Sequence, residues 1–247
     1  MSTNALYKDL SGYYDLMCVD IDYHAQSQHI HRLNQIFGNK GNTHLDVACG
    51  TGPHVRHFIN FGFHSNGLDI NQPMLDIAKA RCPEAHFSLA NMSEFSLIEP
   101  VDLITCFLYS IHYNENIEKL KSCIASVHRA LKTNGVFCFN VVDKNQIDNT
   151  LFVKHTAKQE NDLFTFSSGW HYSGSGDKQS LKVSIEKTAD DQTQIWNDEH
   201  TMVAFSFAQL IEILKPYFEV HVFAHDYEKL ISYDNNAGNA IFTCVKI

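Results

Sequence analysis

The fold of this chain is decided by residues 45–53, which read Leu-Asp-Val-Ala-Cys-Gly-Thr-Gly-Pro. An apolar run with one acidic residue leads into a turn that contains Gly50 and Gly52, and Pro53 follows directly. Glycine permits a sharp turn and the close approach of a ligand. Proline suits the first position of a helix, because its missing N–H would have no partner there. The stretch therefore predicts strand, turn and helix, with a ligand crevice at the carboxyl end of the strand.

Two other kinds of glycine-rich site do not match this turn. The dinucleotide fingerprint needs a third glycine for close helix–strand packing. The corresponding position is Val55 when counted from Gly50 and Pro53 when counted from Ala48. A phosphate-binding loop needs Gly-Lys followed by Ser or Thr, and the turn is not followed by these residues. We therefore expect neither NAD, FAD nor a P-loop nucleotide.

Five strands separated by helices are predicted around the turn. From Thr43 to Val142 the sequence alternates short apolar runs with helical patterns, which is typical of βαβ units and a parallel sheet. The spacing of apolar residues predicts a helix between the last two strands that ends at Asn134-Gly135. Its inward stripe is Ile117, Leu120, Ile124, Val127 and Leu131. The expected strands are His44–Ala48, Ser65–Ile70, Ala85–Leu89, Leu103–Leu108 and Val136–Val142.

A different pattern follows the fifth strand. Residues 144–204 alternate apolar and polar side chains, with turn signals at 174–177 and at Asp190-Asp191, which predicts a small antiparallel β insertion. The run from Ser206 to Gln209 has the form of a capping box and predicts a new helix. Two closing strands are expected at Phe218–Ala224 and Ala240–Val245, as antiparallel neighbours.

The predicted fold is α/β: a Rossmann-like, seven-stranded, mostly parallel sheet with helices on both faces and the antiparallel insertion after the fifth strand. The predicted division is an N-terminal lid and helix (1–42), a cofactor-binding core (43–143), a substrate or dimerisation insertion (144–204) and core completion (205–247). The lid is rich in aromatic residues, namely Tyr7, Tyr13, Tyr14 and Tyr23. The helix after it is expected to point Ile30, Leu33, Ile36 and Phe37 inward.

A second acidic residue strengthens the prediction of a ligand crevice. The second strand ends in Gly67-Leu68-Asp69, and a carboxylate at this place can accept hydrogen bonds from both ribose hydroxyls of a nucleoside. Asp46 and Asp69 bracket one βαβ unit. The pair is a more specific signal than either residue alone.

Composition limits the class of acceptor. The chain has 247 residues, of which 44% are hydrophobic and 19% charged, enough for a sizeable core. Its formal net charge of −9 and the absence of a Lys/Arg cluster disfavour nucleic acid and an anionic membrane surface. The seven cysteines are scattered without a CxxC pair, as expected for small buried side chains in a reducing compartment. With neither a signal peptide nor a membrane span predicted, we expect a cytoplasmic protein that acts on a small molecule.

These motifs resemble those of class I S-adenosylmethionine-dependent methyltransferases over about Tyr7 to Val142. The run DVACGTGxHxxHF recurs in small-molecule N-methyltransferases such as the TDP-aminosugar N,N-dimethyltransferases, and residues 46–58 read DVACGTGPHVRHF. The resemblance implies methyl transfer from S-adenosylmethionine to a small soluble acceptor at nitrogen, with S-adenosylhomocysteine as product. Residues 139–143 (FNVVD) depart from the Glu-Pro-Trp-like run of the aminosugar enzymes. Glycine-like, amine and other small acceptors therefore stay open.

The resemblance also implies where the cofactor binds. Ala48, Gly50 and Gly52 would line its methionine moiety, with Asp46 near the amino group. Asp69 would hold the ribose.

The resemblance also implies that the adenine and the sulfonium contact residues at or after the ends of the second, third and fourth strands. The resemblance places Ile70 and Met74 on either side of the adenine. Asn91, followed by Met92, takes the place of the Asp that usually accepts a hydrogen bond from the adenine amino group, and an amide oxygen can accept the same bond. An alternative is that Asn91 only caps a following short helix. Phe107 would lie under the sulfonium.

Three residues are candidates for orienting or deprotonating the acceptor. Tyr14 would close over the cofactor from the lid, and His112 and Tyr113 follow the fourth strand, where they are expected to face the crevice. The alternatives are a tyrosine that only packs the lid and a surface histidine with a tyrosine beneath it. Methyl transfer can proceed largely by alignment, and a base is needed only when the acceptor arrives protonated.

Other interpretations remain open from the sequence. The chain could bind the cofactor without catalysis, or methylate oxygen, tRNA or protein. The histidine pairs His54/His57 and His29/His31 lack a third ligand at suitable spacing, so no metal is expected. The edge strands of the insertion could pair between two subunits, so a homodimer is expected.

Overall fold

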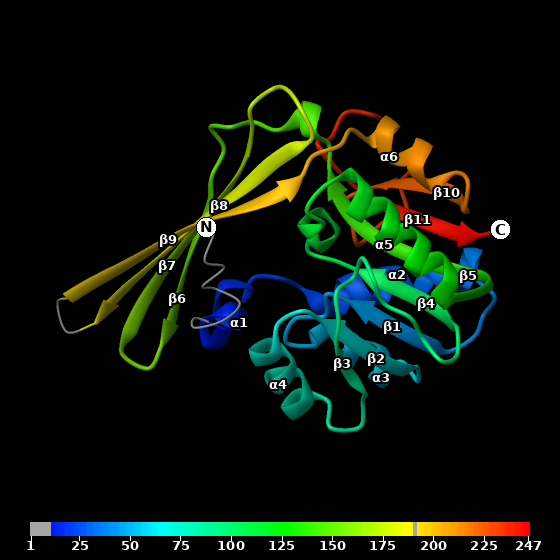
Figure 1. The fold of residues 1–247 in the computed structure, drawn as a ribbon. Coiled ribbons are helices and arrows are strands. Elements are labelled where there is room, and N and C mark those ends of the chain that lie inside the picture. The colour runs from blue at the N-terminus through cyan, green and yellow to red at the C-terminus, as the bar shows by residue number, and fades with distance from the viewer. Residues whose placement is uncertain (1–10, 190–191) are drawn as a thin grey trace.

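The structure, a computed structural model, describes residues 11–189 and 192–247. Its centre is a seven-stranded sheet with strand order β10-β11-β5-β4-β1-β2-β3. β1 (Thr43–Val47) lies parallel to β4 (Val101–Cys106) on one side and to β2 (His64–Asp69) on the other. β11 (Asn239–Lys246) runs in the direction opposite to the other strands of this sheet (Figure 1). This confirms the predicted sheet, whose other strands are β3 (Phe87–Leu89), β5 (Leu131–Val142) and β10 (Phe218–Ala224).

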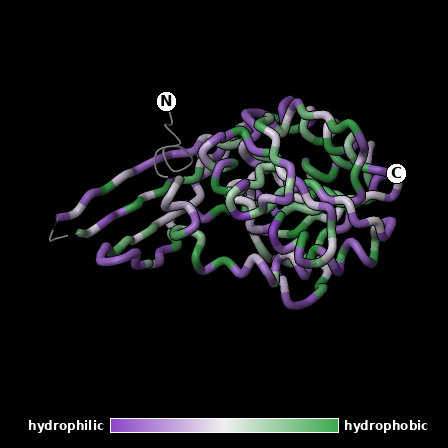
Figure 2. Tube along the Cα trace, turned by 90° about the horizontal axis from the view of Figure 1, so that it is seen from below, coloured by the Kyte–Doolittle hydropathy of each residue, from purple (hydrophilic) through white to green (hydrophobic). Residues whose placement is uncertain are grey.

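Helices cover both faces of the sheet, because its central strands carry apolar side chains on both sides. On β4, Leu103 joins the core under α2 (Tyr23–Phe37) and α3 (Pro53–Asn60), whereas Ile104 joins the core under α5 (Ile117–Ala130) and α6 (Phe207–Leu214). α4 (Gln72–Arg81) packs against β2 and β3 near the edge. Figure 2 shows the hydrophobic segments gathered within this body of the molecule.

The predicted insertion is a separate four-stranded antiparallel sheet that projects from the main body (Figure 1). Its inner face has its own small core around Phe164, Phe166, Val183 and Ile185. The apolar side chains of α1 (Tyr14–Met17) pack against this core. The predicted turn at 190–191 and Tyr7 of the lid lie outside the described residues. The strands are β6 (Val153–Gln159), β7 (Asp162–Tyr172), β8 (Lys178–Ala189) and β9 (Gln192–Val203).

The expected inward face of α2 is wrong at one position. Ile30 and Leu33 are fully buried and Phe37 packs against the same cluster, but Ile36 is 58% exposed. Residues 30, 33 and 37 form one stripe at helical spacing, whereas residue 36 is rotated by about 100° from residue 37 and falls at the solvent edge of the stripe.

The predicted end of the helix before β5 is also wrong. α5 ends at Ala130, and Leu131 already pairs with Val101 of β4. The Lys246 ammonium donates to the carbonyls of His128 and Leu131, both at 2.7 Å, and so stabilises the chain where the helix ends. Asn134-Gly135 instead lies in the irregular stretch where the β4–β5 register shifts.

The C-terminal elements follow the prediction. β10 and β11 are antiparallel neighbours, and α6 begins with the predicted capping box. In it, Ser206 Oγ accepts from the Gln209 N–H at 3.2 Å, and Gln209 Oε1 accepts from the Ser206 N–H at 3.0 Å. Among the described residues, no helix has both the length and the apolar character needed to cross a bilayer.

The capping box yields a stability prediction. Ser206→Ala removes the acceptor for the Gln209 N–H, so we expect the free energy of unfolding in urea to fall by about 1 kcal/mol. Ser206→Asp keeps an acceptor at the cap and is the matched control. Equal losses in both variants would show that the cap is not what stabilises the start of α6.

Candidate active site

A pocket of about 320 Å³ lies at the carboxyl ends of β1 and β2 and extends to the segment after β4. A smaller pocket adjoins it and shares Tyr14, Ala48 and Gly50 in its lining. Such a crevice at strand ends is where open α/β sheets bind ligands. Of the predicted residues, the main pocket is lined by Tyr14, Ala48, Gly50, Asp69, Ile70, Met74, Asn91, Met92 and Tyr113, and the smaller one also by Asp46 and Phe107.

The glycine turn after β1 has three residues in the left-handed backbone region, Ala48, Gly50 and Gly52, with φ of 57°, 53° and 79°. A side chain on Gly50 would point into open space toward Tyr14, so the backbone there lies open to a ligand. Gly52 lines neither pocket, because a Cβ there would lie 3.1 Å from the Cβ of Ala78 on α4. Glycine at position 52 is thus needed for the turn and for the close packing of α3 and α4.

Asp69 closes this turn from the neighbouring strand. One of its carboxylate oxygens accepts from the Gly50 N–H at 2.9 Å, and the other accepts from the backbone and side-chain nitrogens of Asn71 at 2.8 and 3.1 Å. Burial raises the pKa of Asp69, although these hydrogen bonds oppose the shift. The carboxylate is 6% exposed and lines the main pocket, where its remaining lone pairs can accept from the hydroxyls of a bound diol.

Asp46 ends a buried chain of polar groups behind the smaller pocket. Ser65 Oγ lies 2.7 Å from His44 Nδ1, His44 Nε2 lies 2.8 Å from Thr105 Oγ1, and Thr105 donates to Asp46 at 2.6 Å. Burial keeps the pKa of His44 well below its usual value, so this histidine is neutral. Burial also raises the pKa of Asp46 to about 7, although the Thr105 hydrogen bond lowers it.

His54 lies opposite Asp46 in the smaller pocket. Its Nε2–H donates to Gln26 Oε1 at 3.0 Å, so its Nδ1 carries a lone pair, and this atom is 4.0 Å from Asp46 Oδ2. The contact is not an ion pair, because burial lowers the pKa of His54 to about 3 and leaves the ring neutral. Two acceptors that face each other across a small pocket suit a ligand with several N–H donors, such as an ammonium group.

The residues after β2 and β3 form the other end of the main pocket. Met74 is buried and Ile70 is largely exposed, yet both line the pocket. Asn91 Oδ1 accepts from both the backbone N–H and the hydroxyl of Ser93 at 2.9 Å. The Asn91 oxygen that was predicted to accept from adenine thus already has two donors and stabilises a turn. This local role is of the kind that the alternative prediction gave to Asn91, which was to cap a short helix.

The N-terminal helix α1 is held against the glycine turn. The Asp15 carboxylate accepts from Thr51 Oγ1 at 2.6 Å and pairs with the Arg81 guanidinium at 2.5 Å. Arg81 also donates to the carbonyl of Thr51 at 2.8 Å. These contacts keep the neighbouring Tyr14 over both pockets, opposite Phe107 at the end of β4. Asp15 was not predicted from the sequence, where its only local signal is its position beside Tyr14.

The structure places His112 away from the predicted position. The ring is fully buried, stacks on Phe205 at 4.4 Å between centroids, and lines neither pocket. Its Nε2 accepts from the Val142 N–H at 3.1 Å, so its Nδ1–H donates to the carbonyl of Val203 at 2.9 Å. Burial lowers its pKa to about 4. The ring joins the ends of β5 and β9, so the expectation that it faces the crevice is wrong.

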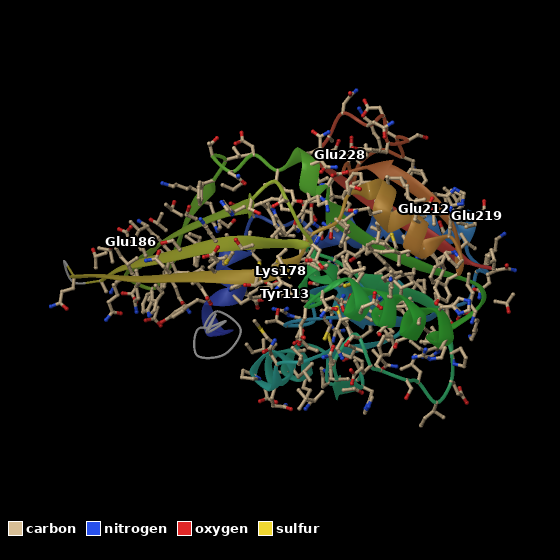
Figure 3. The ribbon with its side chains drawn as sticks, turned by 45° about the horizontal axis from the view of Figure 1, so that its top comes forward. Tyr113, Lys178, Glu186, Glu212, Glu219 and Glu228 are labelled. Carbon is tan, nitrogen blue, oxygen red and sulfur yellow. The ribbon has the colours of Figure 1, made fainter. Side chains whose placement is uncertain are left out.

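Tyr113 does face the main pocket and lies at the base of the antiparallel sheet (Figure 3). The segment that carries it begins with Leu108 and Tyr109, both in the left-handed backbone region, with φ of 53° and 61°. Such strained non-glycine residues are concentrated at functional sites. Other lining residues of this wall were not predicted from the sequence. Four of them follow β4, which was their only signal, whereas Lys119 lies on α5 and Thr201 on β9; the four are Leu108, Ser110, Asn114 and Glu115.

One cysteine, Cys49, lines the smaller pocket. All seven cysteines are buried and free. In the part of the chain that the structure describes, no three His, Cys, Asp or Glu side chains are grouped to bind a metal ion.

The two pockets fit the parts of S-adenosylmethionine. A buried carboxylate with a neutral imidazole opposite lines the smaller pocket, as a cationic amino group requires. A second buried carboxylate and an apolar end with Met74 and Ile70 line the larger one, as a ribose and an adenine require. Tyr14 lines both pockets and Phe107 lines the smaller one, so a sulfonium held there would face aromatic side chains.

A family model described as a methyltransferase domain matches residues 45–135. Among curated relatives, the chain is 35% identical over 92 residues to a dTDP-4-amino-2,3,4,6-tetradeoxy-D-glucose N,N-dimethyltransferase of Saccharopolyspora spinosa, a match that covers 37% of each chain. The first four curated relatives are matched over 37% to 60% of their own length.

Solved structures match over nearly the whole chain. DesVI of Streptomyces venezuelae superposes with a TM-score of 0.84 at 22% identity, over 97% of this chain and 99% of DesVI. CalS10 of Micromonospora echinaspora, an amino pentose methyltransferase solved with S-adenosylmethionine bound, superposes with a TM-score of 0.80 at 16% identity, over 97% of each chain. At these identities the superpositions establish the fold. Residues 45–135 thus match a methyltransferase domain, and the chain has the Rossmann-like fold of class I S-adenosylmethionine-dependent methyltransferases that its motifs predicted.

Proposed function

We propose that this protein transfers the methyl group of S-adenosylmethionine to a nitrogen atom of a small soluble acceptor. The observation that carries the proposal is the pair of buried carboxylates, Asp46 and Asp69, in adjoining pockets at the carboxyl ends of β1 and β2. The methyltransferase-domain match over residues 45–135 supports the same reaction. The net charge of −9 favours a small acceptor over nucleic acid.

The cofactor supplies a methyl group already activated by a positively charged sulfur. The chain's own residues need only hold the reacting atoms in line, which can supply roughly 7–11 kcal/mol of the barrier reduction. In this proposal Asp46 and His54 hold the amino group, Asp69 holds the ribose, and Tyr14 and Phe107 surround the sulfonium. Tyr113 and Ser110 form the wall that the acceptor approaches.

The relatives narrow the class of small molecule whose nitrogen is methylated, because several of them are named as dTDP-aminosugar N,N-dimethyltransferases. At the end of β5 this chain departs from the sequence pattern of the aminosugar enzymes, and the side chains there make structural hydrogen bonds. Asn140 Oδ1 accepts from the Tyr109 N–H at 2.9 Å, and Asp143 Oδ2 accepts from the Phe207 N–H at 2.9 Å. This leaves the acceptor either an aminosugar nucleotide or a smaller amine.

An acceptor panel with methyl-labelled S-adenosylmethionine tests the proposed reaction. The panel contains dTDP-3-amino-3,6-dideoxyglucose, glycine and ethanolamine, followed by a small-metabolite extract. We expect labelled N-methyl product from at least one of these. Cofactor binding without any labelled small molecule would refute the proposed transfer, and label recovered only in protein or RNA would refute the small acceptor. A homodimer through the edge strands of the antiparallel sheet is a further part of the proposal, which a monomer in light scattering would refute.

Asp69→Asn tests the proposed ribose contact. The variant loses the charge that strengthens hydrogen bonds from the ribose hydroxyls, so we expect S-adenosylhomocysteine affinity in calorimetry to fall roughly 10- to 100-fold. Asp76→Asn, on the exposed side of α4, is the matched control and should bind normally. Unchanged affinity in Asp69→Asn, with thermal unfolding confirming a folded protein, would contradict the assignment.

The raised pKa of Asp46 predicts a pH dependence of cofactor binding. With a pKa of about 7 in the free protein, the carboxyl is neutral below that pH and cannot pair with an ammonium group. We therefore expect affinity for S-adenosylhomocysteine to fall up to tenfold per pH unit below 7 and to level off above it. His54 stays neutral throughout this range, because its pKa is about 3.

The matched variant for this dependence is Asp46→Asn. It should bind more weakly at pH 8 and lose most of the slope between pH 6 and pH 8, while Asp69 in the adjoining pocket is unchanged. A slope in Asp46→Asn equal to that of the wild type would show that another group is responsible.

A further inference from the structure

A chain of three hydrogen-bonded side chains leads from the main pocket into the base of the antiparallel sheet. Tyr113 Oη, on the pocket wall, lies 2.5 Å from His200 Nδ1 on β9. His200 Nε2 lies 3.1 Å from a carboxylate oxygen of Asp198 on the same strand. Figure 3 places Tyr113 at the junction between the main body and this sheet.

The direction of these hydrogen bonds follows from the chemistry of the groups. A carboxylate only accepts, so His200 carries its hydrogen on Nε2 and donates it to Asp198. In the neutral ring Nδ1 is then an acceptor, and Tyr113 donates its phenolic hydrogen to it. A hydroxyl, an imidazole and a carboxylate in this order have the arrangement in which the hydroxyl can pass its proton to the ring while the carboxylate stabilises the resulting cation.

The position and the burial of these three residues suit a role on the wall of the pocket that the acceptor would approach. Tyr113 is half-buried, and Tyr14, Ser110 and Thr201 line the same pocket. His200 is 1% exposed and the Asp198 side chain 11%, so bulk water has little access to the relay. The antiparallel sheet that supplies both residues also packs on α1, which carries Tyr14.

We propose that Tyr113, His200 and Asp198 form a proton relay that deprotonates the ammonium group of the methyl acceptor. The proposal rests on the proposed function and names the base for that reaction. Tyr113 is the residue that touches the acceptor. His200 holds the proton, and Asp198 is a positioning residue that orients the ring and stabilises its charged form.

The proposed step is a proton transfer followed by the methyl transfer. An acceptor R–NH3⁺ gives one proton to Tyr113 Oη while the phenolic hydrogen of Tyr113 moves to His200 Nδ1, which leaves a neutral amine, a neutral tyrosine and an imidazolium beside Asp198. The amine lone pair then forms the N–CH3 bond, and the electrons of the broken C–S bond remain on sulfur as a neutral thioether. His200 returns its proton to solvent after the product leaves.

The electrostatic setting keeps the His200 ring neutral near pH 7, the state in which its Nδ1 can take up a proton. Burial lowers the pKa of its ring, and the Asp198 carboxylate opposes this shift. The other titratable side chains of the pocket are Tyr14, Asp69, Glu115 and Lys119, the last paired with Glu94. These side chains are the same in the wild type and in the variants below, so their effect on the pKa of His200 cancels when the pH profiles are compared.

His112, the other histidine of this region, cannot serve as the base. Its two ring nitrogens are engaged with backbone groups of β5 and β9, and it does not reach the pocket. A purely structural role for His200, as a buried ring satisfied by Tyr113 and Asp198, is the alternative that the experiment must separate from a relay.

The experiment compares the pH profiles of turnover for the wild type, Tyr113→Phe, His200→Asn and Asp198→Asn. The acceptor is the member of the panel above that the wild type methylates fastest. Asn at position 200 can still accept from the Tyr113 hydroxyl but cannot take up its proton. For Tyr113→Phe and His200→Asn we expect kcat at pH 7 to fall roughly 10²- to 10⁴-fold, the usual contribution of a general base.

The decisive readout is the pH at which the loss disappears. Above the pKa of the acceptor amine the substrate arrives without its extra proton, so the variants should approach the wild-type rate. A structural role predicts a loss that is equal at all pH values, and that result, or no loss, would overturn the relay. Nitrogen NMR of the imidazole rings provides a second readout without acceptor, in which a His200 ring protonated on Nδ1 in the wild type at pH 8 would also overturn it.

Failures of the two proposals can be told apart. If the wild type methylates no member of the panel, the proposed function is wrong, and the relay falls with it. If the wild type is active and the variant profiles run parallel to its own, only the relay is wrong. Tyr113→Phe removes a single hydroxyl from the pocket wall and keeps the test valid if His200→Asn does not fold.

Discussion

The arrangement of this molecule depends on the hydrogen bond between the Gly50 N–H and the Asp69 carboxylate, 2.9 Å long, which joins the turn after β1 to the end of β2. Parallel pairing brings both strand ends to the same edge of the sheet, and the bond then holds the turn open beside a buried negative charge. A buried carboxylate is costly unless donors surround it. The backbone N–H groups of Gly50 and Asn71 supply such donors, so the turn and the charge stabilise each other.

The site is completed by parts of the chain that are distant in sequence. Asp15 connects α1 to Thr51 and Arg81, which brings Tyr14 over the glycine turn. From the other side, the base of the antiparallel sheet reaches the pocket through His200 and its contact with Tyr113. In the proposed reaction, the main sheet presents the cofactor crevice, while the N-terminal helix and the insertion shape the space in which an acceptor approaches the sulfonium.

The sequence predicted this fold well where a local pattern has one physical cause. The alternation of strands and helices, the antiparallel insertion and the capping box at Ser206 were all confirmed. It failed where the outcome depends on a partner far along the chain. α5 ends at Ala130 because Leu131 pairs with β4 and Lys246 donates to the last carbonyls, and the pattern around Asn134 carries no trace of either contact.

For the site, the sequence by itself determined the ligand crevice, because a glycine turn and two acids at strand ends must meet once the strands pair in parallel. Tertiary structure alone decided the polar environment of each residue. His112 and Tyr113 are neighbours in sequence, yet one is buried between β5 and β9 and the other faces the pocket beside His200. Burial and hydrogen-bond partners set these differences, and both come from elements that fold onto the segment from elsewhere in the chain.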